Sequence, residues 1–267
     1  TQSDTHTSTE PQHHRTPRTK EKMSKPFEKI QLMYWPGRGL MEVPRMMLAA
    51  SKTEFEDGRY GADELKKIEA DLACNLGRMP AIKIDGEHTI GQSSAINYYI
   101  ASSLGYMGSS ILEAAQIISI LEHLRELKQA LYKVAEYGTK PDPEKLKAFF
   151  TAGATDVSGI AERKTRSERG MVFYLGRLES LVGKDGFAVG GKLSLADFLI
   201  YNSFAEKLTE KDNGLSKDAQ YRAEPFHSLK LMEAALEKAP KVKAITKTVA
   251  SNPAIVEYLS KRGKQSF

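Results

Sequence analysis

No aliphatic or aromatic side chain occurs in the first 22 positions of the chain, which hold Thr, Ser, Pro, His, Gln and charged residues. A segment with so little apolar surface cannot offset the entropy that it would lose on ordering. We therefore predict a disordered polar tail over residues 1–27, with order beginning near Phe27. Met23 would make a plausible native start, which leaves open whether residues 1–22 belong to the native protein.

Strand and helix periodicities alternate in the next part of the chain. Apolar Ile30, Leu32 and Tyr34 recur at every second position, which predicts a strand, and the Pro-Gly-Arg-Gly run at 36–39 breaks it. A hairpin signal, Asp-Gly, stands at 85–86. The pattern then predicts a helix over Met41–Ser51, a strand over Thr53–Glu56, a helix over Asp63–Cys74, strands over Pro80–Ile84 and Glu87–Ile90, and a helix over Ser93–Ser103. This order is typical of an α/β domain, which we place at residues 28–106.

From Ile111 onward the sequence shows helical periodicity and no convincing strand. A mixed α/β unit followed by a helical unit predicts two domains, the second at residues 111–267, with a Gly-rich linker over 106–110 between them. The predicted helices are Ile111–Glu136, Glu144–Val182 with a bend near Gly153 and Gly159, Ser194–Leu208, and two or three short helices between Ser228 and Leu259.

Composition narrows the function classes open to the chain. Its 267 residues are 40% hydrophobic, and no apolar run reaches the roughly 18 residues of a membrane helix. The single cysteine, Cys74, excludes an internal disulfide framework and a multi-thiolate zinc site, and it fits a reducing compartment. Five basic and three acidic residues in the tail account for +2 of the net charge of +5. The remaining charge is small and interspersed, so we expect no nucleic-acid partner.

Five local motifs occur in a consistent order: Leu32–Trp35 running into Gly37–Gly39, Arg78–Ile82, Asp85-Gly86, Gln92–Ile96, and Leu193–Asp197. Over about residues 28–262 this set resembles the cytosolic glutathione S-transferase family, and within it the tyrosine-type, sigma-like group. The resemblance implies an α/β thioredoxin-like N-terminal domain, with a mixed four-stranded sheet and three helices, followed by an all-α C-terminal helical bundle.

The resemblance makes Tyr34 the catalytic residue. A thiol is mostly protonated at neutral pH, and its thiolate is the nucleophile, so a donated phenolic hydroxyl could stabilise the thiolate of glutathione. From the strand pattern alone, the favoured interpretation of Tyr34 is an aromatic residue of the core, and it is the resemblance that makes it catalytic. Positions 33–37 contain no Ser, Thr or Cys, which argues against the serine- and cysteine-type relatives.

Glutathione-binding residues also follow from the resemblance. It implies a cis Met79–Pro80 bond, which would turn the backbone of Met79 outward to pair with the cysteinyl part of glutathione as an added strand. Gln92 and Ser93 open a helix whose N-terminus suits the γ-glutamyl carboxylate, although a plain N-cap serine is the alternative. Arg78 would reach the glycine carboxylate, or it is a solvated loop residue.

Two further charged residues carry weaker expectations. By resemblance, Arg38 orients Tyr34 or lowers its pKa, and Glu126 reaches across a dimer to the ammonium group of glutathione. An exposed charge on a helix is the alternative for Glu126. The chain departs from the sigma-like pattern at Leu40, which replaces a second basic residue, and along residues 65–67, where a tryptophan and a lysine are expected. The Ser-Leu-Ala-Asp run at 194–197 predicts a capping box with a folding role.

The function implied is conjugation of glutathione to an apolar electrophile, in detoxification or xenobiotic metabolism. Met33, Trp35 and Tyr132 are candidate walls of the electrophile pocket. Glutathione is a co-substrate, with no metal or other cofactor, and we expect a cytoplasmic homodimer without a membrane partner. Two alternatives stay open: glutathione-dependent isomerisation of a lipid endoperoxide, as in prostaglandin synthases, and a non-catalytic binding or structural member such as the lens crystallins.

Overall fold

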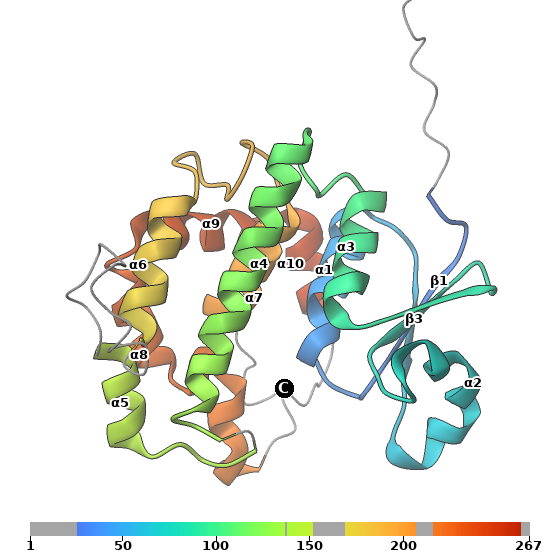
Figure 1. Cartoon of the computed structure of the whole chain (residues 1–267), viewed down its shortest axis with the longest axis horizontal. Helices are drawn as coiled ribbons and strands as arrows, with labels where there is room; N and C mark the ends of the chain where they lie inside the picture. Colours follow the sequence, from blue (N-terminus) through green and yellow to red (C-terminus); the bar gives the residue numbers. More distant parts are fainter. Residues whose placement is uncertain (1–25, 137, 152–168, 207–215, 263–267) are drawn as a thin grey trace, which may run out of the picture.

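The computed structural model describes residues 26–136, 138–151, 169–206 and 216–262 (Figure 1). Its N-terminal part contains a mixed four-stranded sheet in the order β2-β1-β3-β4. The central strand β1 (Ile30–Tyr34) is parallel to β2 (Glu56–Arg59) and antiparallel to β3 (Ala81–Ile84), which pairs with β4 (His88–Gly91). The predicted sheet is therefore confirmed. Asp85 and Gly86 both have positive φ angles, as a tight hairpin turn requires.

The second strand lies three residues later than the sequence predicts, at residues 56–59 instead of 53–56. Asp57 and Gly58 are poor strand formers, so local preference argues against them. Tertiary contacts decide otherwise, because a Cβ on Gly58 would lie 2.7 Å from the carbonyl oxygen of Leu32 on β1. The close approach of the two strands requires glycine at this position.

Helices cover both faces of the sheet. On one face lie α1 (Glu42–Ala50), which follows the short 3-10 turn η1 (Gly39–Met41), and α3 (Ser93–Ser103). On the other lies α2 (Glu69–Leu72), flanked by 3-10 turns η2 (Ala62–Ile68) and η3 (Ala73–Asn75). The prediction of one α-helix over 63–74 is thus wrong, because the apolar spacing of this segment does not distinguish i+3 from i+4 hydrogen bonding.

The C-terminal part is helical throughout the residues that are described. Its helices are α4 (Ile111–Tyr132), α5 (Pro143–Thr151), α6 (Met171–Leu181), α7 (Leu195–Phe204), α8 (Leu229–Leu236), α9 (Pro240–Ala250) and α10 (Pro253–Lys261), with 3-10 turns η5 (Lys217–Ala223) and η6 (Pro225–His227). Within the predicted helix 144–182, the described residues form α5 and α6. Its expected bends at 153 and 159 lie outside the described residues.

One apolar core joins the two parts. Buried residues of β1, α1 and α3 form a continuous cluster with those of α4, α6, α7 and α9. In Figure 1, α1 and α3 lie between the sheet and the helical bundle, so they pack on both. Phe27, which the prediction places in the tail, is buried and stacks on Tyr99 with ring centroids 6.4 Å apart. The folded domain therefore includes Phe27.

The capping box at the start of α7 is confirmed. The Asp197 carboxylate accepts hydrogen bonds from the backbone N–H of Ser194 at 2.8 Å and that of Ala188 at 2.7 Å, and the Ser194 hydroxyl donates to it at 2.5 Å. All of these groups are deeply buried, and burial raises the pKa of Asp197 to about 6. Asp197 thus fixes the start of the central helix, a folding role.

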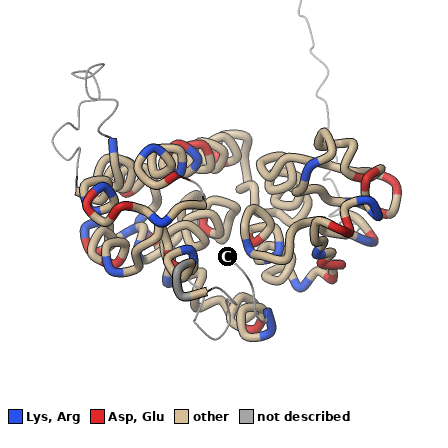
Figure 2. Tube along the Cα trace, turned by 90° about the horizontal axis from the view of Figure 1, so that it is seen from below, with Lys and Arg blue, Asp and Glu red and all other residues tan. Residues whose placement is uncertain are grey.

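Acidic and basic residues are interspersed along the chain, and Figure 2 shows no large face of one sign in that view. Among the described helices, none is long and apolar enough to cross a membrane. The same residues contain no group of three or more His, Cys, Asp or Glu side chains that could hold a metal ion.

Candidate active site

Several predicted residues meet at one end of the sheet. Met33 of β1 pairs with Ala81 of β3, so the next residues outward, Tyr34 and Pro80, end at the same edge. The Met79–Pro80 bond is cis, as expected. In the described part of the chain, the backbone N–H and C=O of Met79 take part in no hydrogen bond, so they are available to an added strand.

Asn75 holds this edge together. Its buried amide nitrogen donates to the carbonyl oxygens of Arg78 and Pro80, both at 2.9 Å. Its oxygen accepts a hydrogen bond from the side chain of Gln92 at 2.9 Å. A Cβ on Gly91 would lie 2.4 Å from the Asn75 side chain, so Gly91 allows this close packing. One amide therefore links the cis-proline loop to the start of α3.

The N-terminus of α3 lies beside the cis-proline loop. Ser93 is the first helical residue and Gln92 is the N-cap, so Ser93 does not cap this helix and that alternative is wrong. Within the described residues its hydroxyl has no hydrogen-bond partner. The first N–H groups of a helix have no partner within the helix and carry partial positive charge, so this end of α3 suits a carboxylate.

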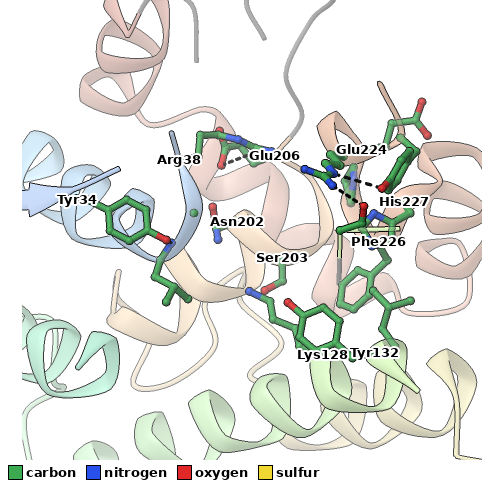
Figure 3. Close-up of a pocket in the computed structure, with 17 residues that line it drawn as sticks. Tyr34, Arg38, Lys128, Tyr132, Asn202, Ser203, Glu206, Glu224, Phe226 and His227 are labelled. Carbon is green, nitrogen blue, oxygen red and sulfur yellow. Dashed lines mark hydrogen bonds and ion pairs between the residues drawn. The ribbon is translucent and has the colours of Figure 1, made fainter. Parts of the chain in front are cut away.

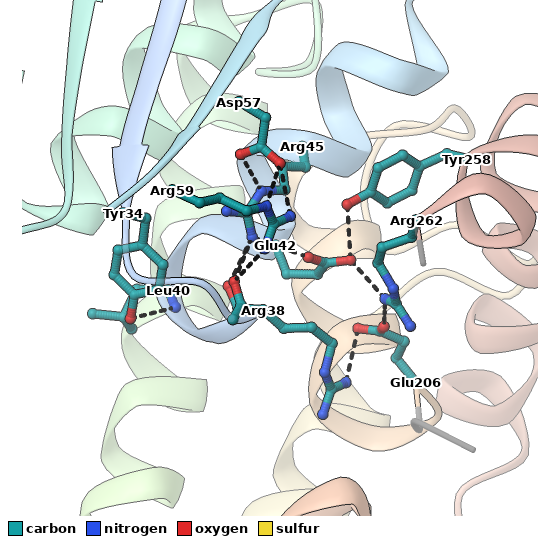
Figure 4. Close-up of polar contacts among 11 residues, drawn as sticks. Tyr34, Arg38, Leu40, Glu42, Arg45, Asp57, Arg59, Glu206, Tyr258 and Arg262 are labelled. Atoms are coloured by element: carbon teal, nitrogen blue, oxygen red, sulfur yellow. Dashed lines mark hydrogen bonds and ion pairs between the residues drawn. The ribbon is translucent and has the colours of Figure 1, made fainter. Parts of the chain in front are cut away.

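The Tyr34 hydroxyl lies over the turn that follows β1. Its oxygen accepts a hydrogen bond from the backbone N–H of Leu40 at 3.1 Å (Figure 4). Gly39 has φ +41°, and a Cβ there would lie 2.5 Å from the same oxygen. A phenolic hydroxyl both accepts and donates, so this bond is compatible with donation to a sulfur. At position 40 it is therefore the backbone that contacts the tyrosine.

A buried arginine holds the turn in place. Arg45 of α1 donates from Nη1 to the carbonyl oxygens of Gly37 at 2.8 Å and Arg38 at 3.2 Å. Its Nε donates to Asp57 at 2.9 Å, and Asp57 also pairs with Arg59 at 2.7 Å. Arg45 is fully buried, so these bonds supply the partners that its charge requires. Strand β2 and helix α1 together thus fix the backbone next to Tyr34.

A second set of buried charges connects the turn to the C-terminal helices. Arg262 donates to Glu42 at 2.7 Å and to Glu206 through the same nitrogen, and Glu206 pairs with Arg38 at 3.2 Å (Figure 4). The Tyr258 hydroxyl donates to Glu42 at 3.1 Å. Burial raises the pKa of Glu206, while Arg38 and Arg262 oppose that shift. The network spans α1, the end of α7 and α10.

A cavity of about 430 Å³ opens beside the Tyr34 hydroxyl. The turn after β1, α4, α7 and the 3-10 turns η5 and η6 form its walls. In Figure 3 the polar ends of Tyr34, Asn202, Lys128 and Tyr132 face the same space. The volume is that of a small-molecule site. Its lining residues include Tyr34, Arg38, Leu40, Lys128, Tyr132 and Phe226.

Comparison with known proteins identifies the fold family. Residues 30–102 match the glutathione S-transferase N-terminal domain, and residues 149–262 match the glutathione S-transferase C-terminal domain. The chain belongs to the glutathione S-transferase family. S-crystallin 3 of Enteroctopus dofleini is 24% identical over 240 residues, which cover 88% of this chain and 98% of that protein.

Two proteins named as glutathione S-transferases also resemble this chain over most of their length. Probable glutathione S-transferase 7 of Caenorhabditis elegans is 27% identical over 212 residues, covering 79% of this chain and 96% of that protein. The solved structure of monomeric Na-GST-3, a glutathione S-transferase from the hookworm Necator americanus, has a TM-score of 0.65 at 23% identity. It covers 90% of this chain and 100% of that one, so the two share the fold.

Of the three residues predicted to form the electrophile pocket, only one lines the cavity. Tyr132 lines the cavity, as predicted. Met33 does not: it is fully buried on the other face of the sheet, against Ile68 and Leu72. Successive side chains of a strand point to opposite faces, so Met33 and Tyr34 cannot share a pocket. Trp35 is 42% exposed and does not belong to the cavity lining.

Of the predicted charged residues, one lines the cavity and the other two are exposed elsewhere. Arg38 lines the cavity, but its guanidinium pairs with Glu206 and so does not have Tyr34 as its main partner. Arg78 is exposed beside the cis-proline loop, with only a long contact of 3.5 Å to the Asn75 carbonyl oxygen. Glu126 is exposed on α4. Burial raises the pKa of Tyr174 on α6, and the negative charge of Glu126 adds to this increase.

Sequence reasoning missed the residues that position this site. Asn75, Arg45, Glu206 and Arg262 have no motif around them, and their partners are distant in sequence. One signal was readable: Glu42 and Arg45 are charged residues three positions apart inside the apolar helix that follows the tyrosine turn. Charges on a buried helix face need partners. The partners themselves could not be named without the fold.

Proposed function

We propose that this chain conjugates glutathione to apolar electrophiles as a tyrosine-type, sigma-like member of its family, with Tyr34 stabilising the thiolate. One observation carries the proposal: Tyr34 lines the cavity and also ends β1 at the same edge of the sheet as Pro80. A nucleophile bound at that edge would therefore meet an electrophile held in the cavity at the phenol. Orienting two reactants in this way removes much of the entropic barrier to their reaction.

Glutathione would bind along the edge formed by the cis-proline loop and α3. The Met79 backbone offers one donor and one acceptor to the cysteinyl part. The start of α3 at Gln92 and Ser93 offers donors to the γ-glutamyl carboxylate, and Arg78 is exposed for the glycine carboxylate. In the reaction the thiol loses its proton to solvent. Its sulfur forms a bond to the electrophilic carbon, and the leaving group departs with the bonding electron pair.

The decisive experiment removes one oxygen. Tyr34→Phe should lower the rate of conjugation with an aryl halide by about 10²-fold, the usual effect of losing one donor to a developing anion. Glutathione binding, measured by calorimetry, should persist. Tyr132→Phe is the matched control, since it removes a phenol from the same cavity away from the sheet edge, and its rate should change little. An unchanged rate in Tyr34→Phe would overturn the mechanism.

A non-catalytic member is the second candidate, favoured by the similarity to S-crystallin 3 and by Leu40 in place of a basic residue. Titration of the bound glutathione thiol by its ultraviolet absorbance distinguishes the two. A transferase lowers the thiol pKa below its value in free glutathione, whereas a carrier leaves it unchanged. This measurement needs no electrophile, so it does not depend on choosing the right substrate.

We also propose that the chain forms a homodimer in which Glu126 contacts the ammonium of glutathione bound to the partner. The exposure of Glu126 on α4 supports this role. Light scattering should give twice the mass of 29.7 kDa. Glu126→Gln should weaken glutathione binding without changing that mass. A monomer with normal glutathione affinity would refute the proposal. The solved structure of Na-GST-3 is described as monomeric, so the test is open to either outcome.

A further inference from the structure

One of the cations that line the cavity beside Tyr34 has no partner among the residues that the structure describes. Three cations, Arg38, Lys128 and Arg222, and two carboxylates, Glu206 and Glu224, line it. Arg222 donates to the carbonyl oxygen of Gly138 at 2.7 Å, and Arg38 pairs with Glu206. Across the residues that the structure describes, Lys128 makes neither an ion pair nor a hydrogen bond. Among the charged side chains of the lining, Lys128 is therefore one for which the described residues supply no partner.

The two carboxylates of the lining do not balance this charge. Glu206 lies between Arg38 and Arg262 and so is already shared by two guanidinium groups. The Glu224 carboxylate is exposed and accepts a hydrogen bond from the Leu229 backbone N–H at 2.7 Å. Both carboxylates thus have other partners, and neither forms an ion pair with Lys128.

The surroundings of Lys128 favour the binding of a negatively charged group next to its amino group. The residue is half-buried on α4, and in Figure 3 its amino group points toward Ser203. Burial and the neighbouring Arg38 lower the pKa of Lys128. The Nε of Arg38 is itself buried without a hydrogen-bond partner. Both features mark a place where an anion would be favoured.

Much of the remaining lining is apolar, from Leu40, Leu131, Pro225, Phe226 and the ring of Tyr132, and the polar side chains of Asn202, Ser203, Tyr221 and His227 complete it. We infer that the cavity takes an apolar molecule carrying one acid group, such as a carboxylate, with the acid bound between Lys128 and Arg38 and the apolar part against the apolar side chains. This assignment rests on the proposed function and names the substrate class: an acidic electrophile in place of a neutral one.

The test compares two probes that share the naphthalene ring, the anion 1-naphthaleneacetate and its neutral methyl ester. Each is titrated into the full chain at pH 7 without glutathione, and naphthalene fluorescence reports binding. The wild-type protein should bind the acid about ten- to hundredfold more tightly than the ester, the range for a hydrogen bond to a charged group. Lys128→Met should abolish this preference and leave ester binding within about twofold.

Two variants serve as controls. Lys133→Met removes an exposed lysine from the end of the same helix, outside the cavity lining, and should keep the preference. Lys128→Arg retains the charge and should keep most of it. If Lys128→Met does not fold, as judged by circular dichroism, Lys128→Gln takes its place.

Equal affinity of the wild-type protein for acid and ester would overturn the inference. So would a preference that survives in Lys128→Met, or an equal loss of both probes, which would mean that the lysine only shapes the cavity. Because no glutathione is present, these outcomes are independent of the conjugation chemistry. A failed Tyr34→Phe test with an intact acid preference would remove the proposed mechanism and leave the binding site.

Discussion

Replacing Arg262 should destabilise the protein far more than its place near the end of the last helix suggests. Its side chain is 7% exposed, and one nitrogen bridges the buried carboxylates of Glu42 and Glu206. Arg262→Met would leave both without their shared cation. Removing one partner of a buried ion pair costs about 3–5 kcal/mol. Arg45 and Arg38 remain near the two carboxylates, so we expect the lower end, about 3 kcal/mol.

Chemical unfolding at pH 7, followed by circular dichroism, measures this loss. A drop of about 3 kcal/mol corresponds to roughly 6–12 °C in melting temperature for a protein of this size. The matched control is Lys261→Met, one residue earlier, whose side chain is 72% exposed in a surface pair with Glu257. Surface pairs contribute about 0–1 kcal/mol, so this variant should melt close to the wild-type protein.

The loss should also depend on pH. Burial raises the pKa of Glu206, and without Arg262 the pKa rises further. A group whose pKa is raised on folding stabilises the fold while protonated and loses that contribution as pH rises through its folded pKa. The deficit of Arg262→Met should therefore shrink at pH 5 and grow toward pH 8. Adding Glu206→Gln should recover part of the stability at neutral pH. A deficit equal to that of Lys261→Met, or one independent of pH, would refute the reasoning.

Two further predictions concern the tyrosine turn and the capping box. In Gly39→Ala the new methyl group would lie 2.5 Å from the Tyr34 oxygen, so conjugation measured by steady-state kinetics should slow by at least about tenfold; Gly86→Ala, with φ +78° and no atom within 4 Å of its Cβ, should leave the rate unchanged. Asp197 should titrate near pH 6 by carbon NMR, and because that pKa is raised from 3.8, its stabilisation is complete below about pH 4 and lost as pH rises through 6. Relative to Asp197→Asn, the wild-type protein should lose about 3 kcal/mol between pH 4 and pH 8, and a carboxyl that titrates near 3.8 would contradict this.

The sequence by itself predicted the features that depend on near neighbours. The hairpin at residues 85–86 follows from the preference of Asp-Gly for positive φ, and the bounds of α3 at 93 and 103 were predicted to the residue. The capping box at the start of α7 needs only residues three apart. The motifs near Tyr34, Pro80 and Gln92 indicated the family because their order and spacing carry that information.

Only the tertiary structure decided which distant residues hold the site. Asn75 contacts Gln92, Arg45 contacts Asp57, and Arg262 contacts Glu42 across 220 positions, so no local pattern could reveal these pairs. The strand β2 formed against local preference because β1 offered a partner at the right distance. Whether a charged residue such as Lys128 has a partner depends on what the fold brings beside it. The reason is physical: burial makes an unpaired charge costly, and burial is a property of the packed chain.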